Sequence, residues 1–160
     1  MDQRKKREVK SPFDTALNYI SYKQRTACEV EKYLSSRGVE YDEVQTTVDK
    51  LKEYNYINDE QYAQDFVSAY KRKLSARDIE QRLVFRGINS FIIEDALVDY
   101  PEHEQEETAL SLAKSVVKKY KDIEPGELNK KIIRALAAKG FSYECTKRCI
   151  SQIEEESDGS

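Results

Sequence analysis

The sequence of 160 residues carries 27 Lys and Arg against 30 Asp and Glu, which gives a formal net charge of −3. Such a balance provides no overall positive field that would draw the chain to nucleic acid or to a membrane. No run of 18 apolar residues is present, which excludes a membrane span, and three Cys are too few for a disulfide framework. With 36% charged residues and only five Gly, the composition is typical of helix-rich repeat proteins. The few cysteines favour a cytoplasmic location, and we also expect a monomer.

The N-terminal third contains a basic lead-in followed by a first helical repeat. Residues 1–12 lack periodicity and are interpreted as a flexible basic arm, either merely solvated or in contact with phosphates. From residue 13 the apolar spacing is helical, which predicts a three-helix repeat over residues 13–57. Thr26 and Glu29 have the spacing of a capping box, and Asp42 is predicted to cap the third helix of this repeat.

The same plan recurs over residues 58–101. Asn58 or Asp59 is predicted to cap the first helix, and Gln61 lies at the capping-box spacing from Asn58. Ser75 and Asp78 form a further capping box, which opens the second helix.

The last repeat is predicted over residues 102–153 and begins with a long apolar-striped helix that ends near Tyr120. Its first residues include His103 among several Glu, and this segment is interpreted as a solvated acidic linker. Residues 154–160 are acidic and are predicted to form a disordered tail.

Three glycines align the repeats. Gly38, Gly87 and Gly140 are separated by 49 and 53 residues (87−38 and 140−87). Each is predicted to end a helix, because Gly tolerates the left-handed backbone conformation after a helix C-terminus. Apolar residues recur eight and four positions before and ten positions after each glycine: Val30, Leu34 and Val48; Ile79, Leu83 and Leu97; Ile132, Leu136 and Ile150. The repeated pattern predicts an all-α fold of three tandem three-helix repeats.

Residues that could support catalysis or bind a cofactor are scarce. Neither a Gly-rich phosphate loop nor a Ser-His pair occurs, and His103 is the sole histidine. Cys28, Cys145 and Cys149 provide three thiols without a partner histidine, too few for a closed zinc site. We therefore predict that the protein is not an enzyme and that it has no catalytic, cofactor-binding or metal-binding residues.

Basic residues are more informative, because they cluster although the chain is acidic. Such clusters are either solvated faces or a groove that follows phosphates or meets an acidic protein surface. Several Tyr could stack on bases, but Tyr33, Tyr62 and Tyr100 fall on predicted core faces. The candidate contacts with a partner or with DNA are Lys71, Arg72, Lys73, Arg77, Arg82, Arg86, Lys114, Lys118, Lys121, Lys131 and Arg134.

A helix–Gly–helix element in each repeat leaves an alternative open, a DNA-binding transcription regulator of the helix-turn-helix type. In that class the third helix is the basic reader of the major groove. Residues 91–100 of the second repeat contain no Lys or Arg, which disfavours sequence-specific readout.

One segment is unusually specific, Tyr-Ile-Asn-Asp-Glu-Gln-Tyr-Ala at residues 56–63, and it is supported by residues 16–21, 37–38, 86–88 and 139–141. Together these segments resemble the RecX family of bacterial regulatory proteins. The resemblance implies that the repeats form an elongated, curved right-handed array. It also implies a partner, the filament of RecA recombinase on single-stranded DNA, whose strand exchange, ATP hydrolysis and co-protease activity would be modulated, mostly by inhibition. Single-stranded DNA itself could be contacted through the basic clusters, and no cofactor is implied.

The chain also departs from the family pattern. Many relatives carry a Gly-rich basic segment where this chain has residues 74–78, Leu-Ser-Ala-Arg-Asp. Many are also more basic overall, which shifts the expectation for this acidic chain toward protein contact.

Overall fold

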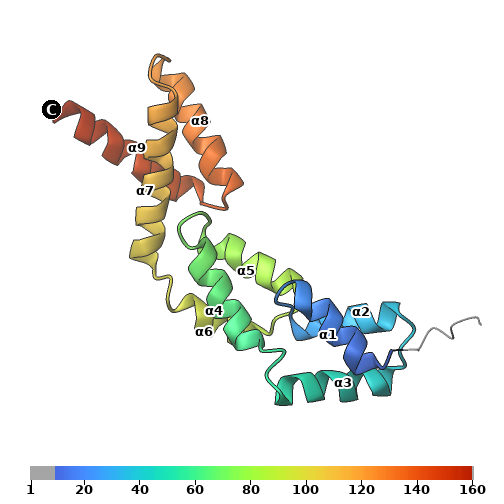
Figure 1. Ribbon diagram of the computed structural model, residues 1–160. Coiled ribbons are helices and arrows are strands. Elements are labelled where there is room, and N and C mark those ends of the chain that lie inside the picture. Colours follow the sequence, from blue (N-terminus) through green and yellow to red (C-terminus); the bar gives the residue numbers. More distant parts are fainter. Residues whose placement is uncertain (1–9, 160) are drawn as a thin grey trace, which may run out of the picture. The chain divides into compact units, whose positions relative to one another are not determined.

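The computed structural model describes residues 10–159, so most of the predicted basic arm lies outside the described residues. Within the described range the chain forms nine helices and no strand (Figure 1). The predicted all-α fold of three tandem three-helix repeats is confirmed. The helices are α1 (Pro12–Tyr22), α2 (Ala27–Ser36), α3 (Tyr41–Glu53), α4 (Asp59–Tyr70), α5 (Ala76–Phe85), α6 (Ser90–Leu97), α7 (Glu102–Lys119), α8 (Pro125–Ala138) and α9 (Tyr143–Asp158).

The chain divides into two compact units. Unit 1 contains the described residues up to Tyr62 together with Arg86–Ile88, the turn after α5. Helices α1, α2 and α3 contact one another there, because each presents an apolar stripe at helical spacing. Their shared core consists of Ala16, Ala27, Val30, Leu34, Val44, Val48, Leu51 and Ile57.

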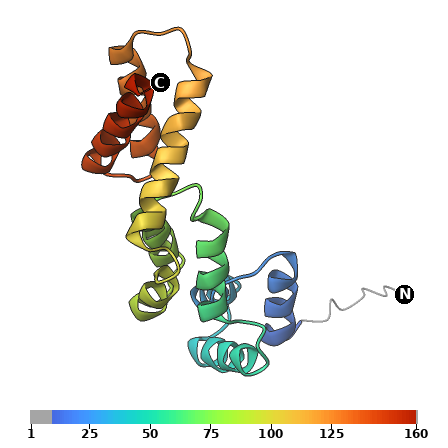
Figure 2. The same cartoon turned by 90° about the vertical axis from the view of Figure 1, so that its left-hand side faces the viewer.

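Unit 2 contains Ala63–Phe85 and the described residues from Asn89 onward. Helices α7, α8 and α9 pack side by side, as both views show (Figure 2). Ala109, Ala113, Ile132 and Leu136 lie at the centre of their core. In the second repeat the buried Tyr100 hydroxyl donates a hydrogen bond of 2.8 Å to the Leu74 carbonyl oxygen. None of the described helices combines the length and apolar composition needed to cross a bilayer.

The predicted caps are largely confirmed. Thr26 and Glu29 form a reciprocal capping box at the start of α2. The Asn58 side chain accepts a hydrogen bond from the Gln61 amide (3.0 Å), and the Ser75 hydroxyl accepts one from the Asp78 amide (3.0 Å).

The prediction that Asp42 caps α3 is wrong. The N-cap residue is Glu40, which makes no side-chain capping bond, and Asp42 lies inside the first turn. A carboxylate there still interacts favourably with the positive end of the helix dipole, so Asp42 suits the helix start without capping it.

All three aligned glycines adopt the predicted left-handed conformation. Their φ angles are +82° at Gly38, +78° at Gly87 and +89° at Gly140. Each directly follows the C-cap residue or the last turn of a second helix, where a side chain would be strained.

Two acidic segments differ from the prediction because they are helical. His103 lies in the first turn of α7 rather than in a linker, since Pro101 ends the preceding segment and Glu102 and Glu104 suit a helix N-terminus. At the other end α9 continues to Asp158, so residues 154–158 are not disordered.

Candidate functional site

The turn after α4 and the start of α7 build a hollow in unit 2. Lys71 and Arg72 line it from the turn, and α7 contributes His103, Glu104, Glu107, Thr108 and Ser111. The turn is fastened to α7, because the Thr108 hydroxyl donates a 2.9 Å hydrogen bond to the Lys71 carbonyl oxygen. The Lys71 Nζ atom also lies 3.5 Å from Glu104 Oε2. This turn, with Lys71 and Arg72, is thereby held beside α7, although the two segments are far apart in the sequence.

A second hollow continues along α7. It is lined by Glu107, Leu110, Ser111, Lys114, Ser115 and Lys118, and it shares Glu107 and Ser111 with the first hollow. Residues 107, 111, 114 and 118 recur at helical spacing and therefore lie on one side of α7. We call the joined surface the α7 face, defined by Lys71, Arg72, Glu107, Ser111, Lys114 and Lys118.

The charges of the α7 face are mixed but mainly positive. Lys114 Nζ lies 3.1 Å from Glu156 Oε2 of α9, and both side chains are about half exposed. A surface ion pair of this kind contributes little to stability, so the Lys114 ammonium group can readily exchange Glu156 for another anion. The hydrogen bond from Lys114 lowers the pKa of the Glu156 carboxyl. Arg72 and Lys118 are exposed to solvent.

Other predicted cations of the second repeat lie elsewhere in unit 2. Arg82 pairs with Asp78 on α5 at 3.3 Å and lies 5.7 Å from the centre of the Tyr70 ring. Lys73 also lies over this ring, at 5.9 Å. Arg77 lines a different hollow, between the start of α5 and the starts of α7 and α9.

Arg86 directly follows the last residue of α5 and interacts with residues of unit 1. It belongs to unit 1, where its carbonyl oxygen accepts a 2.7 Å hydrogen bond from the Thr26 hydroxyl. Its side chain interacts with the Tyr62 hydroxyl, whose pKa is nevertheless raised because burial outweighs the nearby positive charge. The backbone and the side chain of Arg86 thus both contact unit 1.

The remaining predicted cations belong to the third repeat but line neither hollow of the α7 face. Lys131 is half-buried and lies 4.4 Å from the centre of the Tyr120 ring. Lys121 follows the end of α7, and Arg134 lies on α8, both exposed.

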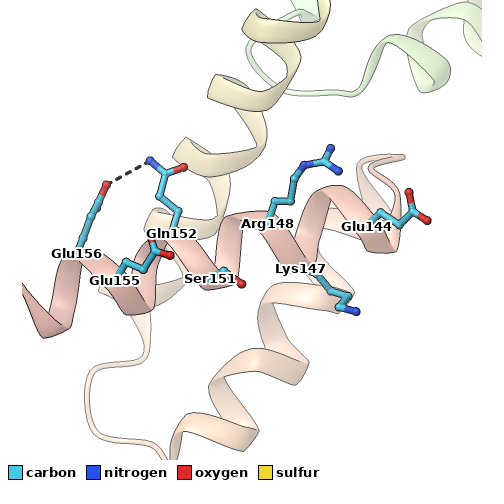
Figure 3. A pocket seen from close by; sticks show the side chains of 7 residues that line it. All are labelled: Glu144, Lys147, Arg148, Ser151, Gln152, Glu155 and Glu156. Carbon is cyan, nitrogen blue, oxygen red and sulfur yellow. Dashed lines mark hydrogen bonds between the residues drawn. The ribbon is translucent and has the colours of Figure 1, made fainter.

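Sequence reasoning missed two basic residues on α9. Lys147 and Arg148 lie together with Glu144, Glu155 and Glu156 around an exposed hollow (Figure 3). Arg148 pairs with Glu106 of α7 at 3.5 Å and also lines the hollow that contains Arg77. The available signal in the sequence was the apolar set Cys149, Ile150 and Ile153, which leaves the preceding pair outside the apolar stripe.

The cysteines of α9 are not poised for chemistry. Burial raises the pKa of both thiols, to about 11 for Cys149, where the neighbouring Cys145 adds to the shift. Both are therefore protonated at neutral pH, and a protonated thiol is a poor nucleophile and a poor metal ligand. Among the described residues, no group of three or more His, Cys, Asp or Glu could hold a metal ion.

The fold and the α7 face define a helical protein built of three-helix domains with a charged surface suited to binding. Family models agree with each repeat: "RecX, first three-helix domain" matches residues 13–51, the second matches residues 58–97 and the third matches residues 104–150. The chain belongs to the RecX family of regulatory proteins.

Individual relatives and solved structures agree with this assignment. Regulatory protein RecX of Bacillus pumilus is 32% identical over 90% of this chain, and that of Lactococcus lactis subsp. lactis is 36% identical over 89%. The matches cover 56% and 55% of those proteins, so the chain spans just over half the length of these curated relatives. The crystal structure of RecX from Lactobacillus salivarius has a TM-score of 0.76 and 32% identity, covering 89% of this chain and 94% of that one.

Proposed function

We propose that this chain binds filaments of RecA recombinase on single-stranded DNA and modulates them, mainly by inhibiting strand exchange, ATP hydrolysis and co-protease activity. Membership of a family of regulatory proteins supports the proposal. The observation on this chain that carries it furthest is the α7 face, where Lys71, Arg72, Lys114 and Lys118 line two connected hollows.

A local cationic face on an acidic chain suits a filament better than free DNA. Lys and Arg side chains release counterions when they neutralise phosphates, and the gain in affinity grows with the number of phosphates contacted. Four cations interrupted by Glu104 and Glu107 provide only a small gain, and the net charge of −3 opposes it. Tight binding then requires protein contacts as well, and the charges mainly set orientation and association rate.

The proposal is tested by adding the protein to RecA on single-stranded DNA and following ATP hydrolysis. We expect the hydrolysis rate to fall as the protein approaches the molar amount of RecA. An unchanged rate at that ratio would contradict the proposed function. The assay contains the ATP and Mg²⁺ that hydrolysis by RecA itself requires. Nothing further is added for this chain, because its proposed activity is binding alone.

A pair of charge reversals tests the α7 face within this assay. Arg72→Glu with Lys118→Glu removes one exposed cation from each hollow, and we expect about tenfold more protein to be needed for half-inhibition. The matched control is Lys32→Glu with Lys52→Glu, on the exposed surfaces of α2 and α3, which changes the net charge equally. Equal inhibition by both variants would place the filament contact elsewhere.

The helix-turn-helix alternative is not favoured by the structure. Glu94 and Asp95 lie exposed on α6, where a reader of the major groove would present Lys or Arg. Selection of duplexes from a random-sequence pool separates the two functions, because enrichment of one sequence is expected only from the alternative.

A further inference from the structure

The exposed side of α6 carries an unusual surface. Phe91 and Val98 are 78% and 72% exposed, although both are large apolar residues. Glu94 and Asp95, also exposed, stand between them in the sequence. The four positions are i, i+3, i+4 and i+7, so they share one side of the helix. An acidic centre is thereby flanked by two apolar side chains.

The last turn of α5, a helix that packs against α6, carries two further exposed apolar residues. Val84 is 57% exposed and Phe85 is 84% exposed. In the part of the chain that the structure describes, the strongly exposed large hydrophobic residues other than Tyr are these four alone. We define the α6 face as Val84, Phe85, Phe91, Glu94, Asp95 and Val98. Grouped apolar exposure of this kind marks interaction sites, whereas isolated exposed residues do not.

The other two repeats provide an internal control for the α6 face. Counted from the aligned glycines, the positions of its four apolar residues carry only small or polar residues elsewhere. The first repeat has Ser35, Ser36, Asp42 and Asp49, and the third has Ala137, Ala138, Glu144 and Ser151, all exposed. Glu144 and Ser151 are visible on the exposed side of α9 (Figure 3). Packing of a repeat therefore does not require apolar residues at these positions.

The charge around the α6 face selects the kind of partner. Around the α6 part of this face, residues 87–113 contain no Lys or Arg, whereas Glu94, Asp95 and Asp99 are exposed. The nearest cations in the preceding chain are Arg82 and Arg86, beside Val84 and Phe85. A nucleic acid backbone would be repelled by these carboxylates. In a two-fold contact between copies of this chain the carboxylates would face their own counterparts, which also disfavours self-association.

We infer that the α6 face docks a basic amphipathic segment of a partner protein. Its apolar side chains would cover Phe91 and Val98, and its Lys or Arg would pair with Glu94 and Asp95. Helical segments commonly bind in this way, with apolar anchors at helical spacing and charges around them. This inference goes beyond the proposed function, because it assigns a protein-binding surface that does not involve the α7 face.

A labelled peptide of about 18 residues tests the inference, long enough to form a helix with Leu on one side and Lys flanking it. Its binding to the whole chain is followed by fluorescence anisotropy. We expect Phe91→Ser with Val98→Ser to weaken binding about tenfold, as loss of aromatic anchors generally does. The matched control is Glu144→Gln with Ser151→Ala at the equivalent positions of α9, which should bind as the unmodified chain does. Equal binding by both variants would overturn the inference.

A charge exchange gives an independent readout. Glu94→Lys with Asp95→Lys should lose the basic peptide and gain a peptide in which every Lys is replaced by Glu. All the substituted residues are exposed, so circular dichroism and the melting temperature should stay unchanged. Binding of the basic peptide that survives the exchange would overturn the inference.

Two further measurements separate this surface from its alternatives. Sedimentation of the unmodified chain should show no dimer, and a dimer abolished by Phe91→Ser with Val98→Ser would instead make the α6 face a contact between copies. The variant Arg72→Glu with Lys118→Glu should retain peptide binding. Failure of the α7 face as a filament contact would therefore leave this inference standing, and the reverse also holds.

Discussion

Two equivalent contacts between a glycine turn and the start of a helix are made by different hydrogen bonds. We call each of these contacts a joint. In unit 1 the glycine turn after α5 closes against the start of α2, and in unit 2 the glycine turn after α8 closes against the start of α5. In the first joint the Thr26 hydroxyl accepts from the Glu29 amide (3.1 Å) and donates to the Arg86 carbonyl oxygen (2.7 Å). In the second, the Ser75 backbone amide donates to the Lys139 carbonyl oxygen (2.9 Å).

The packing at the two glycines differs as well. A Cβ atom on Gly87 would come within 2.3 Å of the Cβ atom of Cys28, which is fixed to the backbone of α2. A Cβ atom on Gly140 would come within 2.4 Å of the Ser75 hydroxyl oxygen and 2.8 Å of Asp78 Cβ. Gly38 meets no atom within 4 Å. The aligned glycine of each repeat is thus required for its left-handed backbone conformation. Gly87 and Gly140 are also required because no room is left for a side chain.

The largest effect is expected from Gly87→Ala. The left-handed conformation costs a side chain about 1–2 kcal/mol, and forced overpacking against Cys28 adds about 1–3 kcal/mol. Gly38→Ala has only the conformational cost and is the matched control. Urea unfolding followed by circular dichroism should show a loss near 3 kcal/mol for the first and near 1 kcal/mol for the second. Equal losses would mean that the contact with Cys28 does not constrain the joint.

A smaller difference in lost stability is expected between substitutions of the two capping residues, Thr26 and Ser75. Thr26→Val removes a cap and leaves the Arg86 carbonyl oxygen without its donor, so we expect a loss of about 2 kcal/mol. Ser75→Ala removes only the cap, because the bond to Lys139 comes from the backbone, and should cost about 1 kcal/mol.

Thr26→Ser is the control for that pair, since it keeps the hydroxyl and should restore most of the stability. Thermal unfolding of the three variants in one buffer measures the order of their stabilities. A loss for Ser75→Ala as large as that for Thr26→Val would show that the joints do not differ in the way their hydrogen bonds indicate.

The smallest effect is a coupling between substitutions. Ser75→Ala removes the atom nearest to a Cβ on Gly140, so Ser75→Ala with Gly140→Ala should be about 1 kcal/mol more stable than the sum of the single losses predicts. Cys28→Ala leaves the Cys28 Cβ atom in place and should give less coupling with Gly87→Ala. A double-mutant cycle at each joint measures both values, and equal coupling would contradict this account.

Sequence patterns predicted the parts of the fold that depend on near neighbours. Thr26 with Glu29, Asn58 with Gln61 and the three glycines act within one helical turn, so their spacing alone determined their roles. The Asp42 prediction failed because acidic residues stand at positions 40, 42 and 43, and spacing alone does not decide at which of them the helix begins. The acidic end of α9 looked disordered because its composition is polar, but a helix already packed through Cys149 continues into it.

The candidate site was only partly predictable. All four cations of the α7 face were among the predicted residues, since clusters of Lys and Arg are visible in the sequence. Their grouping was not predicted, because nothing in the sequence shows that Lys71 is held to Thr108 and Glu104 of α7. Such pairings depend on which turns pack together across repeats. The sequence alone determined the three helical repeats, because helix spacing and caps act locally. Only the tertiary structure decided which charges share a face and which glycines need space, because those contacts join residues far apart in the chain.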